Sequence, residues 1–396
     1  MPGPGAFFYG KEEIEAALQV LQKGYLFRYG SESDPGFLHK VYSLEREFAK
    51  YYRADYALAT TSGTASLLVS VLALGLRPGD EIIVPAYTFV ASYSACIFAG
   101  VVPVLAEIDE SLTIDPGDIE KRITPRTRAI MPVHMLGNPC RMDEIRDIAL
   151  KHELLVLEDC CQAMGATYKE IKLGTIGDMG VYSLNFFKTI NSGDGGLIVT
   201  NNSRLYERAF GIHDQGHKPL RTGVEVGERS ILGLNFRMNE LTAAVALAQL
   251  HKTDRIIDTL REKKSKLKFL IGEPEDMHFR TLNDPEGECA TLCTVIFDSR
   301  DKAARVCKAL GTKTVDKSGW HVYANMEHVM TWLRQAGQPH EKGAYPVTDD
   351  ILSRSVNISI GVVDDGLGAG WGINPLSSDE EIEKCAAEFI KTCKNA

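Results

Sequence analysis

The chain has 396 residues and a formal net charge of −9, and 24% of its residues are charged. This length is sufficient for two domains with buried cores, and the composition excludes a disordered or low-complexity chain. The acidic balance argues against nucleic-acid binding, which needs a basic surface. No apolar run is long enough to span a membrane, and the first residues lack the basic and apolar regions of a secretory signal. We therefore expect a protein that binds neither nucleic acid nor a membrane.

Nine cysteines are present, and they match neither a disulfide framework nor a zinc site. Their number is odd and no C-x-x-C pair occurs, which favours reduced thiols. The closest spacings, in Cys160–Cys161 and between Cys289 and Cys293, are not those of zinc ligands. We therefore expect a cytoplasmic protein without a metal site.

Short apolar runs alternate with amphipathic stretches in the first half of the chain. This alternation is typical of βαβ units, in which parallel strands form a sheet and the connecting helices cover both of its faces. The strands are expected at residues 81–85, 102–108, 128–134 and 154–159, and the helices at 64–76, 89–100 and 141–152.

The pattern changes in the next part of the chain, where GVYSLNFFK and GGLIVTN predict two short strands joined by a glycine-rich turn. Residues 239–271 predict one long helix that carries the chain out of the first domain. Further on, Ser378 and Glu381 have the spacing of a capping box at the start of a closing helix. We therefore expect an α/β fold with a large domain over residues 1–255 and a smaller α+β domain over residues 256–396.

The first candidate site lies in TTSGTASLL, residues 60–68, where a short strand ends and a helix begins. The free N–H groups and the positive end of the helix dipole make such a helix start suitable for anions. A simple cap is the more common role of Ser or Thr before a helix. This motif alone therefore leaves phosphate binding and capping open.

The second candidate site is LLVLEDCCQA, residues 154–163, which places Glu158 and Asp159 at the carboxyl end of an expected strand. Ligands of open parallel sheets bind at this end. A carboxylate there can keep a heteroaromatic nitrogen protonated through a charge-assisted hydrogen bond. Capping of the next helix is the more common role of an isolated carboxylate.

Two further motifs contribute a lysine and an aromatic ring. In YSLNFFKTINSGDGG, Lys188 follows an apolar run and precedes a glycine-rich turn. A lysine that points inward there is competent for Schiff-base chemistry, whereas a lysine whose ammonium group reaches water would be a surface residue. In PAYTFVAS, Tyr87 and Phe89 follow a strand end, where a ring either stacks on a flat cofactor or packs in the core.

Together these motifs supply an anion cradle, an acid for a ring nitrogen, a Schiff-base lysine and a stacking ring, which are the requirements of pyridoxal 5′-phosphate (PLP). The ordered motifs SGTA, PAYTFVAS, EDCCQA, YSLNFFK with SGDGG, and GLNFRMNELTAA resemble those of the DegT/DnrJ/EryC1/StrS family, from about residue 10 to about residue 260. The resemblance implies a fold-type-I PLP enzyme with a mainly parallel seven-stranded sheet flanked by helices and a smaller C-terminal domain.

The resemblance also implies a role for each matched residue. Lys188 would form the Schiff base and then move the proton, and Asp159 would pair with the pyridinium nitrogen of the cofactor. Asn235 would reach the phosphate of the neighbouring subunit, which implies a homodimer with shared active sites. The other cofactor contacts are expected from Gly63, Thr64 and Ser183 at the phosphate, Gln162 at the phenolic side of the ring, and Phe89 stacked on the ring.

By the same resemblance we expect an aminotransferase that moves an amino group from an amino acid, expected to be L-glutamate, to a keto- or aldehydo-sugar. FRYG, HDQGH and GLNFRMNE are similar to motifs of enzymes that act on acidic octulosonate-type sugars, and a nucleotide-linked sugar is the other acceptor class. Arg28 and His217 are candidates for contacts with the acceptor, although a structural ion pair would equally explain Arg28. His213 and His217 have the spacing of metal ligands, but Gly216 disfavours a helix, so a loop that lines the substrate pocket is the preferred interpretation.

Three alternative functions remain. A sugar dehydratase of the same family is disfavoured on two grounds. Some dehydratases have histidine where this chain has Lys188, and others have a cysteine-ligated iron–sulfur cluster, whereas the cysteines of this chain form no tight C-x-C cluster. An aminocyclitol aminotransferase would use the same motifs. A PLP-binding regulator without turnover is disfavoured by the intact Lys188 and Asp159.

Overall fold

The fold is built around a mainly parallel sheet of seven strands. The structure is a computed structural model and describes residues 3–31, 33–219, 231–339 and 341–396. The strand order is β1-β9-β8-β5-β4-β2-β3, and β9 alone runs antiparallel to its neighbours. The expected fold class is thereby confirmed. The strands are β1 (Tyr56–Thr60), β2 (Glu81–Pro85), β3 (Val102–Ala106), β4 (Thr127–Ile130), β5 (Leu155–Asp159), β8 (Met179–Ser183) and β9 (Gly196–Thr200).

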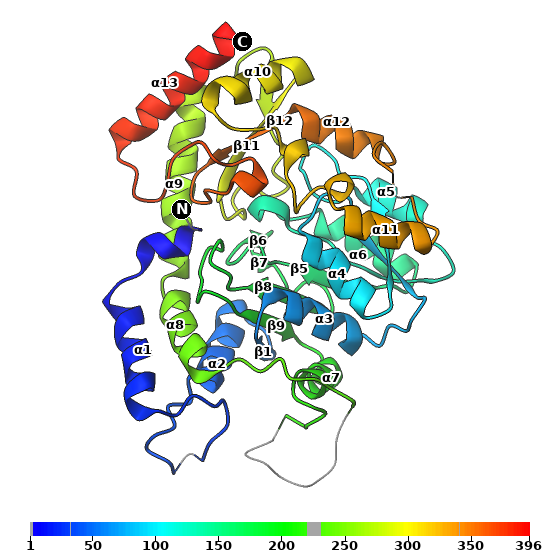
Figure 1. Ribbon diagram of the computed structural model, residues 1–396, viewed down its shortest axis with the longest axis vertical. Helices are drawn as coiled ribbons and strands as arrows, with labels where there is room; N and C mark the ends of the chain where they lie inside the picture. The colour runs from blue at the N-terminus through cyan, green and yellow to red at the C-terminus, as the bar shows by residue number, and fades with distance from the viewer. Residues whose placement is uncertain (1–2, 32, 220–230, 340) are drawn as a thin grey trace.

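Helices lie on both sides of this sheet (Figure 1). Successive strand residues point to opposite faces, so in β1 Ala57 and Ala59 pack into one hydrophobic core and Leu58 packs into the other. Every residue of β2, β8 and β9 is buried, as expected for a sheet covered on both faces. The first core contains residues of α2 (Lys40–Tyr52), α5 (Pro116–Arg122), α6 (Met142–Lys151) and α8 (Glu240–Leu250), and the second contains residues of α3 (Gly63–Ala73), α4 (Val90–Phe98) and α7 (Ser203–His213).

The predicted strands and helices of the large domain are confirmed with small shifts at their ends, but α5 was not predicted because it has only seven residues. The prediction of one helix over residues 239–271 is wrong. These residues form α8 and α9 (Thr253–Ile271), and the chain turns between them at His251 and Lys252. Lys252 donates from Nζ to the backbone oxygen of Phe8 at 2.9 Å. This contact holds the turn against the N-terminal segment, which no helical pattern in the sequence could indicate.

The last part of the chain forms a three-stranded antiparallel sheet in the order β10-β11-β12. The expected capping box of Ser378 and Glu381 is confirmed at the start of the final helix. The predicted domain boundary after residue 255 falls in the first turn of α9 and stays a prediction. The elements are β10 (Met277–Phe279), β11 (Leu292–Phe297), β12 (Ser355–Ser359), α10 (Arg300–Leu310), α11 (Glu327–Gln335), α12 (Pro346–Arg354) and α13 (Asp379–Asn395).

Two smaller parts complete the fold. Near the N-terminus, α1 (Lys11–Lys23) packs against α8, and a short hairpin is formed by β6 (Thr167–Tyr168) and β7 (Ile171–Lys172). Across the described ranges, no helix combines the length and the apolar character needed to cross a membrane.

Candidate active site

A cavity of about 390 Å³ opens at the carboxyl ends of β2, β5 and β8. Parallel α/β sheets bind their ligands at this edge. Segments of the C-terminal part of the chain form the opposite wall of the cavity. Seven of the eight predicted cofactor contacts line it, namely Gly63, Thr64, Phe89, Asp159, Gln162, Ser183 and Lys188.

The start of α3 forms one end of the cavity. Ser62 caps the helix, because its hydroxyl accepts a hydrogen bond from the N–H of Ala65 at 3.1 Å. The N–H groups of Gly63 and Thr64 precede the first intrahelical hydrogen bond, so they are available to an anion. A Cβ atom at Gly63 would lie 2.7 Å from Cβ of Ser183 and 3.0 Å from its hydroxyl. Glycine therefore allows the hydroxyl of Ser183 to lie beside the helix start.

Asp159 lies at the base of the cavity, where β5 ends. The residue is buried, with only 4% of its surface exposed. One oxygen accepts a hydrogen bond from the hydroxyl of Ser92 at 2.8 Å, and the other accepts one from the N–H of Cys161 at 3.0 Å. These two donors fix the plane of the carboxylate. Ser92, which lies in α4, was not predicted as part of the site.

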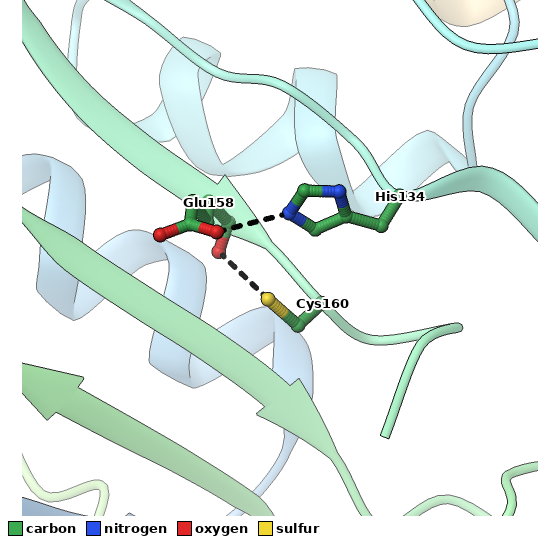
Figure 2. Close-up of side chains that lie close together, drawn as sticks. All are labelled: His134, Glu158 and Cys160. Carbon is green, nitrogen blue, oxygen red and sulfur yellow. Dashed lines mark hydrogen bonds and ion pairs between the residues drawn. The ribbon is translucent and has the colours of Figure 1, made fainter. Parts of the chain in front are cut away.

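The preceding residue, Glu158, points to the opposite face of the sheet, where it lies near His134 and Cys160 (Figure 2). Its carboxylate accepts hydrogen bonds from three backbone N–H groups of residues 174–177 at 2.6–2.7 Å and from Nε2 of His134 at 3.1 Å. Nδ1 of His134 accepts from the N–H of Cys140 at 3.0 Å, so Nε2 carries the proton. Because protein donors already occupy this carboxylate, the cluster is a structural network rather than a metal site.

Lys188 lies in the hairpin that connects β8 to β9. The hairpin is closed by hydrogen bonds from Phe186 N–H to the oxygen of Gly193 at 3.0 Å and from Leu184 N–H to the oxygen of Gly195 at 2.9 Å. Gly193 has a φ of +86°, a conformation that favours glycine. Nζ of Lys188 lies 6.0 Å from the centre of the Phe89 ring, so the amine and the aromatic ring face the same space.

Gln162 also lines the cavity. Its Oε1 accepts a hydrogen bond from the N–H of Leu136 at 3.0 Å. This bond assigns the amide orientation and leaves the amino group of Gln162 as the donor for a ligand. Leu136 has a φ of +54°, and its carbonyl oxygen accepts from Nη2 of the buried Arg280 at 2.8 Å. Thus the C-terminal part of the chain supports this wall.

Sequence reasoning missed Trp320 and His321, which also line the cavity. The segment reaches the site by backbone pairing with the PAYTFVAS motif, in which the N–H groups of Thr88 and Val90 donate to the oxygens of His321 and Trp320 at 2.9 Å. Burial lowers the pKa of His321 to about 3, and the positive charge of Lys188 adds to the effect. His321 is therefore neutral, with its ring centre 5.2 Å from that of Phe89.

Comparison with known proteins agrees with this geometry. The model of the DegT/DnrJ/EryC1/StrS aminotransferase family matches residues 9–363. The chain belongs to this family. The match confirms the family that the sequence motifs predicted, and it confirms that the chain is a PLP-dependent enzyme. It also extends the similarity beyond residue 260, into the part of the chain where the motifs had become weak.

Two relatives and one solved structure illustrate what this chain is similar to. GDP-perosamine synthase of Escherichia coli O157:H7 is 39% identical over 56% of the chain, but the match spans only 60% of the length of that relative. The dTDP-3-amino-3,6-dideoxy-alpha-D-galactopyranose transaminase of Aneurinibacillus thermoaerophilus is 31% identical over 95% of the chain and 94% of the relative. Among solved structures, an aminotransferase from Psychrobacter cryohalolentis superposes with a TM-score of 0.83 at 25% identity, covering 100% of this chain and 99% of that one.

The prediction that Arg28 contacts the substrate is wrong. Its guanidinium group is buried and donates to both carboxylate oxygens of Glu45 at 2.9 and 3.0 Å. It also lies over the rings of Tyr29 and Phe210. A side chain with no exposed surface cannot reach a substrate, so Arg28 forms the structural ion pair that was the alternative interpretation.

The HDQGH loop is not among the described residues that line the cavity of the same chain, and its expected place in a substrate pocket stays a prediction. His213 is buried beside Arg28, with 3.1 Å between Nε2 and Nη1. Burial lowers its pKa to about 3, and the charge of Arg28 acts in the same direction. His217 donates its backbone N–H to the oxygen of Asp214 at 2.9 Å. Asn235 is exposed outside the cavity, and its role stays a prediction.

Proposed function

We propose that the chain is a PLP-dependent aminotransferase that moves an amino group from an amino acid, expected to be L-glutamate, to the carbonyl group of a nucleotide-linked keto-sugar. The observation that carries the proposal is the meeting of three groups in one cavity. These are the anion-binding start of α3, the anchored carboxylate of Asp159 and the amine of Lys188. A phosphate, a basic ring nitrogen and an aldehyde are the groups of PLP that they match.

The residues present fit the cofactor. The N–H groups of Gly63 and Thr64 and the hydroxyl of Ser183 would hold the phosphate, and the space that a Cβ at residue 63 would fill is kept open. The ring of Phe89 would cover one face of the cofactor, and the amino group of Gln162 would donate to its phenolic oxygen. When bound, PLP supplies an electron sink beside the carbon that carries the amino group.

The two catalytic residues perform separate tasks. Asp159, held by Ser92 and the N–H of Cys161, would keep a proton at the ring nitrogen through a charge-assisted hydrogen bond. Lys188 would hold the cofactor covalently, and when the amino donor takes its place the freed amine would accept the proton from the donor carbon. His321 is neutral beside this amine, so it adds no positive charge to the cavity wall.

The relatives named above favour a nucleotide-linked sugar over an acidic octulosonate-type sugar as the acceptor. Among the described lining residues, the charged side chains are Asp159, Lys188, Asp194 and Asp364. No arginine of the same chain is among them. Carboxylates at residues 194 and 364 can accept hydrogen bonds from sugar hydroxyls. The relatives named above for GDP- and dTDP-linked amino sugars support this acceptor class.

The active enzyme in this proposal is a homodimer in the cytoplasm. The exposed side chains of Ile14, Leu18 and Leu21 form an apolar stripe on α1, and Leu234 is exposed beside Asn235. Apolar surface of this kind marks a protein interface. In the dimer, Asn235 would reach the phosphate site of the other subunit. All nine cysteines are free thiols, which supports a reducing compartment.

The proposal is tested by incubating the PLP-loaded enzyme with L-glutamate and a GDP- or dTDP-linked keto-sugar, and detecting the amino sugar by mass spectrometry. Transfer to the nucleotide-linked sugar supports the proposal. Transfer only to an octulosonate-type or an inosose acceptor would show a different substrate class, and loss of water from the sugar would show a dehydratase. If glutamate leaves the absorption of the cofactor unchanged, the result would favour the alternative of a PLP-binding regulator without turnover.

The shared site has its own test. Replacing Asn235 with Ala should weaken PLP binding by about tenfold, the effect of losing one hydrogen bond to a charged group. Sedimentation should still give a dimer, because the apolar stripe on α1 is unchanged. A monomeric wild-type protein that retains full activity would contradict the shared site.

A further inference from the structure

The N-terminal segment, residues 3–9, lies directly against the hairpin that carries Lys188. It contains a short 3-10 helix, η1 (Pro4–Phe8), and Figure 1 places this end of the chain beside α9. The N–H of Gly3 donates to the oxygen of Phe186 at 3.0 Å, and the N–H of Gly5 donates to the oxygen of Lys188 at 3.5 Å. The segment therefore bonds to the backbone of Lys188 itself.

The two glycines of this segment are packed too closely for a larger residue. A Cβ atom at Gly3 would overlap the carbonyl group of Phe187. A Cβ atom at Gly5 would lie 2.8 Å from the oxygen of Thr189 and 2.9 Å from Cα of Ile190. Real Cβ atoms do not approach backbone this closely, so either change must displace the hairpin or the segment.

Further contacts hold the segment in place, one with the same hairpin and one with the chain that follows β12. The hydroxyl of Tyr9 donates to the backbone and side-chain oxygens of Asn191, at 2.8 and 3.0 Å. A Cβ atom at Gly361 would lie 2.9 Å from the ring of Pro4, so the segment also touches the chain just before Val362, which lines the cavity. The segment thus lies between two walls of the cavity, the lysine hairpin and the loop that follows β12.

We propose that residues 3–9 are a positioning element for Lys188: the segment fixes the backbone of the hairpin and so sets where the lysine amine meets the cofactor. The proposal rests on the proposed function of Lys188. The hydrogen bonds within the hairpin close its base, but Lys188 lies in its loop, where the N-terminal segment supplies the outer support. Pro4 and Gly5 are buried by this contact.

The test compares Gly5→Ala with a matched control, Gly10→Ala. The residue at position 10 adopts an extended conformation, and the nearest atom to its added Cβ would be the flexible end of Glu12 at 3.0 Å. We expect Gly5→Ala to lower kcat by about 10- to 100-fold, because a displacement of the order of 1 Å at a reacting group has this effect. The KM for the amino donor should change little, and the Gly10→Ala enzyme should resemble the wild type.

A second readout separates positioning from stability. The nitrogen that would join Lys188 to PLP takes up its proton at a pH that depends on the torsion between this nitrogen and the cofactor ring. The pH midpoint of the absorption band of the loaded enzyme should therefore shift by about half a unit or more in Gly5→Ala. A merely structural weakening would lower the melting temperature and leave this midpoint unchanged. The same shift, smaller in size, is expected in Tyr9→Phe, which removes only the hydroxyl contacts with Asn191 and serves if Gly5→Ala does not fold.

The outcomes are distinguishable. If the wild-type protein shows no absorption band that borohydride removes, the proposed function itself fails. If the wild type shows the band but Gly5→Ala and Tyr9→Phe match Gly10→Ala in kcat and in the pH midpoint, Lys188 is confirmed and the positioning role is overturned.

Discussion

The replacement of Gly63 by Ala tests the phosphate cradle most sharply. The new Cβ would lie 2.7 Å from Cβ of Ser183 and 3.2 Å from Sγ of Cys161, so the start of α3 and β8 would have to separate by several tenths of an ångström. Without ligand the helix end can relax away from Ser183. Binding of the phosphate requires the start of α3 and the hydroxyl of Ser183 to converge on it, so the added Cβ destabilises the bound state.

Overpacking of this kind costs about 1–3 kcal/mol, which corresponds to a PLP affinity about 5- to 150-fold weaker. The dissociation constant is measured by titrating the cofactor-free protein with PLP and following absorption or tryptophan fluorescence. The double variant Gly63→Ala/Ser183→Gly, which removes the opposing Cβ, should recover part of the loss beyond what the two single variants predict. An unchanged affinity in Gly63→Ala would refute the placement of the phosphate between these residues.

Three further predictions concern the acid, the buried ion pair and the buried histidine. Asp159→Asn should lower kcat by about a hundredfold or more, because a neutral amide cannot hold the proton at the ring nitrogen; a steady-state assay that finds wild-type turnover would contradict this role. Glu45→Gln should lower the free energy of unfolding by about 3–5 kcal/mol, because Arg28 would be left as a buried unpaired charge. The kcat of the folded enzyme should stay near that of wild type. A change in the KM for the sugar at unchanged stability would instead favour a substrate role for Arg28. The pKa of His213 is lowered from 6.5 to about 3 in the folded protein, so the unfolded chain binds more protons between these values and stability falls as the pH drops below 6.5. Urea unfolding at pH 7 and pH 5 should show a loss about 2 kcal/mol larger for wild type than for His213→Gln, and equal losses would contradict the buried neutral state.

The part of the site that lies at strand ends was predictable from the sequence. Gly63, Asp159 and Lys188 each lie at or just after the end of an apolar run, and a parallel sheet brings the carboxyl ends of its strands to one edge. Their placement in one cavity therefore follows from local patterns and topology. The family motifs added the expected role of each residue, which pattern alone could not supply.

The residues that were missed or misjudged depend on contacts between distant parts of the chain. His321 reaches the cavity because its backbone pairs with residue 88, and nothing near it in the sequence indicates this pairing. Arg28 finds its partner in Glu45, and no local pattern distinguishes this buried pair from a substrate contact. Likewise, the break between α8 and α9 coincides with the contact between Lys252 and Phe8. Such long-range contacts are set by the packed fold.

The most direct test of the central claim is to reduce the PLP-loaded protein with borohydride and to map the modified lysine by peptide mass spectrometry. The account predicts one modified residue, Lys188, and loss of both the absorption band and the modification in Lys188→Ala. The amount of modification should fall when L-glutamate is added before the reductant, because the donor displaces the lysine. Modification of a different lysine, or a Lys188→Ala variant that retains full turnover, would contradict it.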